Sequence, residues 1–179
     1  MKEKIFEPFM DRLSRDIRNA LSESLVDVLK KKSLVPAQQV AEQFRSRELE
    51  RYYLDYIDVR LQKYEQALGV IAASENTDPL WQGFVLWDLG LFFEVHEILE
   101  HAWLASAGDE KMLLQAMIRA AGVYIKLEHG YDAAAAKISA KAFPVLEKNR
   151  KRLAAYIDPE ILLTALRQVN KQPPILLQG

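Results

Sequence analysis

The chain of 179 residues carries 24 Lys and Arg against 25 Asp and Glu, a formal charge of −1, and half of its residues are hydrophobic. This profile is typical of a soluble globular domain, and the balanced charge argues against electrostatic binding to nucleic acid. The chain has no cysteine, which excludes disulfides, thiol nucleophiles and cysteine-ligated metal sites. The acidic start lacks the apolar core of a signal peptide, and no apolar run reaches the length of about 18 residues that a membrane span needs. We therefore expect a cytoplasmic protein that does not bind membranes.

The first 75 residues predict an amphipathic helical region. Apolar residues recur every three or four positions from 5 to 29 and again from 37 to 73, where Ser46 could interrupt the pattern. A polar break from Ser74 to Asp78 follows, so we expect an N-terminal part at 1–75 and a helical bundle at 76–179. The apolar faces of the first part must pack on the bundle or on a partner subunit, which makes a homo-oligomer through these helices one of the expected arrangements.

Beyond residue 78, aspartates, prolines and glycines mark the ends of further helices. The spacing of apolar residues predicts helices that begin near 79, 90, 113, 132, 144 and 159. No alternation of period two persists, so the expected fold is an all-α bundle of about seven helices without a sheet. The tail from Pro173 to Leu177 is either an extension that packs on the bundle, which we expect, or a short apolar ligand for a partner.

One segment of this bundle, FFEVHEILEHAW at residues 92–103, concentrates carboxylates and histidines in an otherwise apolar helix. A helical turn of about 100° per residue sorts its polar side chains and its tryptophan onto two faces: His96, Glu100 and Trp103 on one, Glu94, Glu97 and His101 on the other. The first face has large apolar neighbours. Because an isolated buried charge costs several kcal/mol, the groups on it must be paired, protonated or bound to something. The second face could point to water.

The next helix carries a polar stripe on an otherwise apolar surface, with Gln115, Arg119, Gly122 and Lys126 spaced four, three and four residues apart. If the two helices pack antiparallel across the short connection at 105–109, this stripe can meet the face of His96. Arg119 is then the expected counter-ion of Glu100.

The segment around the polar cluster resembles the signature of the bacterial and archaeal domain-of-unknown-function 309 family. The residues that carry the resemblance are Asp88-x-Gly90-x-Phe92-Phe93-Glu94-x-His96-Glu97-x-Leu99-Glu100-x-x-Trp103, followed by Gln115. The resemblance covers roughly residues 81–152. It implies a small all-α bundle as the fold and, from the label given to the family, the activity of a metal-dependent hydrolase. Asp88 stands where we expect Asn in the family, and Arg119 stands where a second Gln is common. A fixed cation such as Arg119 beside the carboxylates would disfavour a divalent metal.

The residues leave three alternatives open for this cluster. In the first, His96 and Glu100 bind a divalent metal such as Zn or Mn at positions i and i+4, with Glu97 and His101 as a second such pair, and the metal activates a water molecule. A metal-free variant of this enzyme would use Glu97 or Glu100 as a catalytic base together with His96, but no Ser, Cys or Thr nucleophile lies near the motif. In the second, the cluster is a buried hydrogen-bonded network that fixes the register of two helices and does no chemistry. In the third, the cluster forms a pocket for a small polar or anionic ligand. The binding residues of the second and third alternatives are His96, Glu100, Trp103, Gln115 and Arg119.

Overall fold

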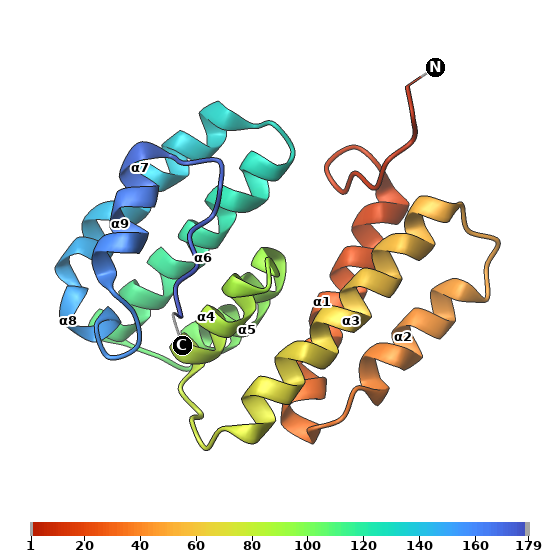
Figure 1. Ribbon diagram of the computed structural model, residues 1–179, viewed down its shortest axis with the longest axis horizontal. Coiled ribbons are helices and arrows are strands. Elements are labelled where there is room, and N and C mark those ends of the chain that lie inside the picture. Colours follow the sequence, from red (N-terminus) through yellow and green to blue (C-terminus); the bar gives the residue numbers. More distant parts are fainter. Residues whose placement is uncertain (1, 178–179) are drawn as a thin grey trace. The chain divides into compact units, whose positions relative to one another are not determined.

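A computed structural model describes residues 2–177 of the chain (Figure 1). Within this range the regular structure consists of nine helices, eight of them longer than a single turn, and no strand occurs. The all-α class is confirmed, with a number of helices close to the seven expected. No helix among the described residues combines the length and the apolar character that crossing a membrane requires. The chain divides into two compact units, residues 1–75 and 76–179.

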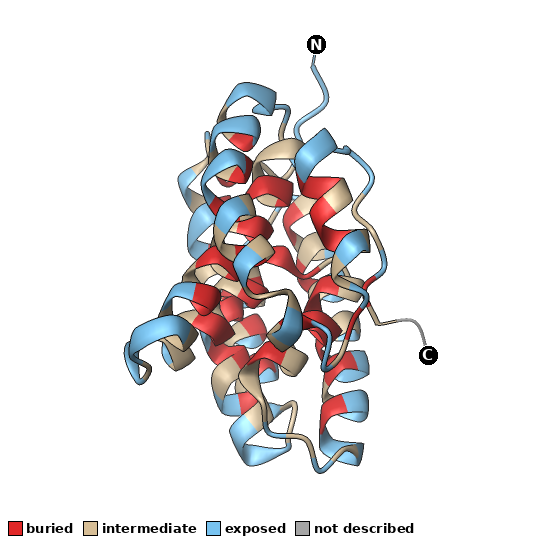
Figure 2. Ribbon diagram, turned by 90° about the vertical axis from the view of Figure 1, so that its left-hand side faces the viewer, coloured by how far each residue is buried: buried red, intermediate tan, exposed pale blue. Residues whose placement is uncertain are grey.

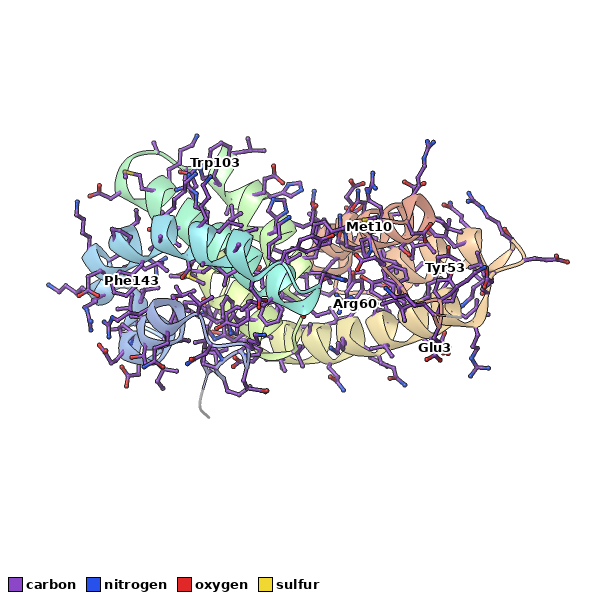
Figure 3. All side chains as sticks on the ribbon, turned by 90° about the horizontal axis from the view of Figure 1, so that it is seen from above. Glu3, Met10, Tyr53, Arg60, Trp103 and Phe143 are labelled. Carbon is purple, nitrogen blue, oxygen red and sulfur yellow. The ribbon has the colours of Figure 1, made fainter. Side chains whose placement is uncertain are left out.

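Three helices make up the first unit: α1 (Arg12–Lys31), α2 (Val35–Arg45) and α3 (Arg51–Ala73). Helix α1 begins later than the apolar periodicity predicts, because the carboxylate of Asp11 caps it by accepting hydrogen bonds from the backbone N–H groups of Leu13 and Ser14. The hydroxyl of Tyr53 on α3 donates to the same carboxylate at 2.7 Å, which ties α3 to the start of α1. The labelled side chain of Tyr53 can be followed in Figure 3.

The core of the first unit lies along the apolar faces of these helices, and α1 packs on both α2 and α3. Ile17, Leu21 and Leu25 of α1 and Ile57 of α3 are fully buried. Residues on the opposite faces of these helices are exposed. Figure 2 shows this alternation of buried and exposed residues along the helices of the chain. The amphipathic pattern at 1–75 therefore does fold into a helical unit. The packing of this unit on the bundle or on a partner subunit stays a prediction.

Six helices make up the second unit: α4 (Pro79–Asp88), α5 (Phe92–Leu104), α6 (Gly108–Glu128), α7 (Asp132–Lys148), α8 (Arg150–Leu153) and α9 (Pro159–Gln168). The prediction of a new helix at Pro144 was wrong, because α7 continues through this proline and ends at Lys148. A proline removes one backbone hydrogen bond from a helix. The buried side chains of Ala142 and Leu146 on either side of it hold α7 against the core.

Helix α5 packs against α4 and α6, α6 packs against α7, and α7 packs against α9. Gly90, whose φ is +72°, lets the chain turn sharply between α4 and α5. The rings of Trp87, Phe92 and Tyr124 lie with their centres 5.1 to 5.3 Å apart and join α4, α5 and α6 in one aromatic core. This core fixes the position of α5, the helix that carries the polar cluster.

Candidate functional site

Glu94 lies in the first turn of α5 and is fully buried. This corrects the expectation that Glu94 points to water together with His101, which is indeed exposed. The two residues share a direction around the helix but lie two turns apart along it, and only the C-terminal turn protrudes. The position of Glu94 near the positive end of the helix dipole favours its negative charge.

The structure brings His96, Glu97 and Glu100 together on α5. One donor atom from each of these side chains lies within 4.8 Å of the donor atoms of the other two. The Nδ1 atom of His96 is 3.8 Å from Oε1 of Glu97, and its Nε2 atom is 3.9 Å from Oε2 of Glu100. The side chains are 36%, 15% and 46% exposed, in chain order, so the cluster is open to solvent on one side.

The donor set of this cluster fits a divalent metal ion. Nitrogen–oxygen distances of 3.8 and 3.9 Å are too long for hydrogen bonds between these atoms. Each is shorter than the span of about 4.2 Å that two bonds of about 2.1 Å to one ion can bridge. The two distances start at opposite nitrogens of the ring, however, and only one of these nitrogens can bind a given ion, so the glutamate on the other side must turn toward it. Other distances between the three donor atoms reach up to 4.8 Å, and small rotations of the partly exposed glutamate side chains suffice to shorten them. One imidazole and two carboxylates are ligands that zinc and manganese accept.

His101 does not join this cluster. Among the described residues, the only group of three or more metal-ligating side chains in mutual reach is the one formed by His96, Glu97 and Glu100. The predicted second pair of Glu97 and His101 is therefore not part of this group and stays a prediction. The flexible side chain of Glu97 instead reaches the imidazole of the residue before it.

The expected ion pair between Glu100 and Arg119 is not formed, and neither Gln115 nor Arg119 makes a hydrogen bond or ion pair within the part of the chain that the structure describes. The reason lies in the rotation of α6. Tyr124 of this helix stacks on Phe92 of α5, and Arg119, five residues earlier, lies about 140° away around the helix axis. The polar stripe therefore lies at the partly exposed side of α6, and Arg119 forms no polar network with the residues that the structure describes.

Trp103 lies near the end of α5, at the periphery of the second unit (Figure 3). The ammonium group of Lys111 on α6 sits 4.3 Å from the centre of its ring, a cation–π contact across the turn between the two helices. Lys111 is not among the residues predicted from the sequence. Its signal was a cation eight residues after a tryptophan, with a short helix–helix connection between them.

Residues 80–138 match the model of a family described as Domain of unknown function (DUF309). The match confirms the family resemblance over α4, α5, α6 and the beginning of α7, and it includes the whole cluster of His96, Glu97 and Glu100. The three helices before residue 80 lie outside it. No significant match to a curated protein or to a solved structure was found.

Proposed function

We propose that His96, Glu97 and Glu100 bind one divalent metal ion of the zinc or manganese type, and that the chain is a metal-dependent hydrolase. The observation that carries this proposal is the convergence of three donor atoms within 4.8 Å on one helix. Three protein ligands leave further coordination positions for water or substrate, which is typical of catalytic rather than structural metal sites. The accessible side of the cluster leaves room for both.

A divalent ion in such a site supplies Lewis acidity toward a carbonyl or phosphoryl oxygen and makes a water molecule more acidic. All three side chains hold the ion, and Glu97 is the less exposed of the two carboxylates. Glu100 is 46% exposed and is the carboxylate that solvent reaches most easily. We assign to Glu100 the additional role of accepting the proton of an attacking water molecule.

Two observations favour this function over a purely structural network. A buried network needs a counter-ion for its carboxylates, and Arg119 does not pair with Glu100. In addition, a carboxylate that is nearly half exposed has little need of a partner, because water solvates its charge. The position of Arg119 also removes the fixed cation that would oppose a metal at this site.

Metal binding is tested by melting the full chain with and without added Zn²⁺ or Mn²⁺. A metal at a concentration 100-fold above its dissociation constant adds about 2.7 kcal/mol to the free energy of unfolding. We expect His96→Ala to abolish this stabilisation. His101→Ala is the matched control, because it removes an exposed histidine of the same helix and should leave the response to metal unchanged. A wild-type chain that does not respond to either metal would contradict the proposal.

Hydrolysis is tested with activated carboxylic and phosphoric esters in the presence of the metal that binds. We expect turnover to stop when a chelator is added and to fall at least about 100-fold in Glu100→Gln, the range that loss of a general base produces. Retention of metal binding in Glu100→Gln would separate the proton-transfer role from the ligand role. Turnover that survives the chelator would exclude a metal-dependent mechanism.

A further inference from the structure

The segment that follows α9 runs back along the second unit toward α4 (Figure 1). The indole N–H of Trp87 donates to the carbonyl oxygen of Pro174 at 2.9 Å. The carboxylate of Asp88 accepts hydrogen bonds from the backbone N–H groups of Leu176 at 2.7 Å and Leu177 at 2.8 Å. Two neighbouring residues at the C-terminal end of α4 thus bind the main chain of the tail.

One side chain of the tail serves as an apolar anchor. Leu176 is 2% exposed, whereas its neighbour Ile175 is 54% exposed. Leu176 borders a shallow depression together with residues 154–158, between α8 and α9, and Ile161 of α9. Main-chain hydrogen bonds combined with one buried side chain are the means by which proteins recognise extended peptides. The same segment of a second copy could make each of these contacts.

The hinge of this tail is strained. Val169, the residue directly after α9, adopts the left-handed conformation with φ 49° and ψ 50°. This conformation is unfavourable for a β-branched residue, which prefers extended backbone. Only residues 170–173 separate Val169 from Pro174, the first residue of the tail that is bound by α4. Short hinges under strain favour the exchange of an element between identical chains, because the open form releases the strain.

We propose that residues 170–177 exchange between two copies of this chain, so that each tail docks on Trp87 and Asp88 of the other copy and Val169 is the hinge. The contacts of residues 174–177 are the same in the monomer and in the exchanged dimer, whereas the hydrogen bond from the Asn170 N–H to the carbonyl oxygen of Ala165 at the end of α9 is lost when the hinge opens. The relief of two strained hinges favours the dimer, and the loss of translational freedom opposes it. The dimer therefore forms as the protein concentration rises.

Sedimentation velocity of the full chain over a range of concentrations measures this equilibrium. Val169→Gly accepts the left-handed conformation without strain and should raise the dissociation constant of the dimer by about tenfold or more. Lys32→Gly is the matched control, because Lys32 ends α1 in the first unit with a φ of 51° and is not part of the hinge. This variant should leave the dissociation constant unchanged.

The anchor is tested with a second pair of variants. Leu176→Lys places a charge at a buried position and should abolish the dimer, whereas Ile175→Lys changes an exposed neighbour and should retain it. A synthetic peptide of residues 172–177 in excess should dissociate the wild-type dimer. The same peptide carrying Leu176→Lys should not.

A wild-type chain that stays monomeric at the highest attainable concentration would overturn the exchange. A dimer that persists in folded Leu176→Lys would also overturn it and would assign the dimer contact to another surface. If Leu176→Lys does not fold, as judged by circular dichroism, the peptide decides the question. A wild-type dimer that resists the peptide excludes docking of the tail in trans.

Discussion

Asp78 and Arg152, 74 residues apart in the chain, form an ion pair with 2.8 Å between Oδ2 and Nη2. Asp78 also caps α4, because its Oδ1 atom accepts the backbone N–H of Leu80, and the hydroxyl of Tyr156 donates to its Oδ2 atom at 2.7 Å. Arg152 in turn contacts Glu110 in the first turn of α6 at 3.0 Å. One carboxylate and one guanidinium thus join the beginnings of α4 and α6 to the segment around α8.

We predict that Asp78→Ala lowers the free energy of unfolding by about 2 to 3 kcal/mol. The change removes a helix cap, which contributes about 1 kcal/mol, and charged hydrogen bonds that are partly screened because both side chains retain some exposure. Asp158→Ala is the matched control. Asp158 caps α9 by accepting the N–H of Glu160, so its loss should cost only about 1 kcal/mol. Urea denaturation of both variants measures the difference, and equal losses would show that Asp78 acts as a cap alone.

The same carboxylate predicts how stability depends on pH. Burial raises the pKa of Asp78, but hydrogen bonds from Tyr156, the Leu80 N–H and Arg152 outweigh this effect and hold the pKa below its ordinary value of 3.8. A lowered pKa in the folded protein means that the ionised group stabilises the fold fully above the ordinary value. This stabilisation is lost as the pH falls through the lowered pKa of Asp78 in the folded protein. Urea midpoints measured between pH 5 and pH 2 should therefore fall less steeply in Asp78→Asn than in the wild-type chain.

Much of this fold could be predicted from the sequence, because helical periodicity and N-terminal caps are local signals. The caps at Asp78 and Asp158 lie where the sequence places them. Pro144 shows the limit of such signals, because packing on both sides of a proline can hold a helix intact at the cost of one hydrogen bond. Asp11 shows a second limit, since the apolar pattern begins before the cap that starts α1.

The candidate site could be predicted in part. Spacing alone placed His96 and Glu100 on one face of a helix, and the structure brings these two side chains together. Spacing could not show that Glu97 bends toward the same imidazole, because that depends on the torsions of a flexible side chain. Spacing also could not show which way the side of α6 that carries Arg119 faces. The rotation of α6 about its axis is set by the contact between Tyr124 and Phe92, and Phe92 lies on another helix.

The exposure of Glu100 and the position of Arg119 predict that these residues are energetically independent. Glu100→Ala should lower the free energy of unfolding of the metal-free protein by less than about 1 kcal/mol, because an exposed carboxylate without a buried counter-ion contributes little. A double-mutant cycle with Arg119→Ala should give a coupling energy near zero. A coupling energy above about 1 kcal/mol would contradict this prediction and would show that Glu100 and Arg119 form an ion pair between α5 and α6.

The hydroxyls of two tyrosines, the buried Tyr124 and the partly buried Tyr156, predict opposite effects when the hydroxyl is removed. The hydroxyl of Tyr124 is buried without a hydrogen-bond partner among the described residues, whereas that of Tyr156 donates to Asp78. Tyr124→Phe removes an unsatisfied polar group from the aromatic core, so it should leave stability unchanged or raise it by about 1 kcal/mol. Tyr156→Phe removes a hydrogen bond to a carboxylate and should lower stability by about 1 to 2 kcal/mol.

The ionisation of Tyr124 provides a second measurement that distinguishes Tyr124→Phe from Tyr156→Phe. Burial raises the pKa of Tyr124 to about 12, because the phenolate would lose its hydration in the core beside Trp87 and Phe92. In a spectrophotometric titration of the folded chain, the tyrosine that ionises near pH 12 should be absent from Tyr124→Phe and present in Tyr156→Phe. A loss of stability in Tyr124→Phe comparable to that in Tyr156→Phe would mean that the Tyr124 hydroxyl is bound in solution, and a buried water molecule would then be the group to look for.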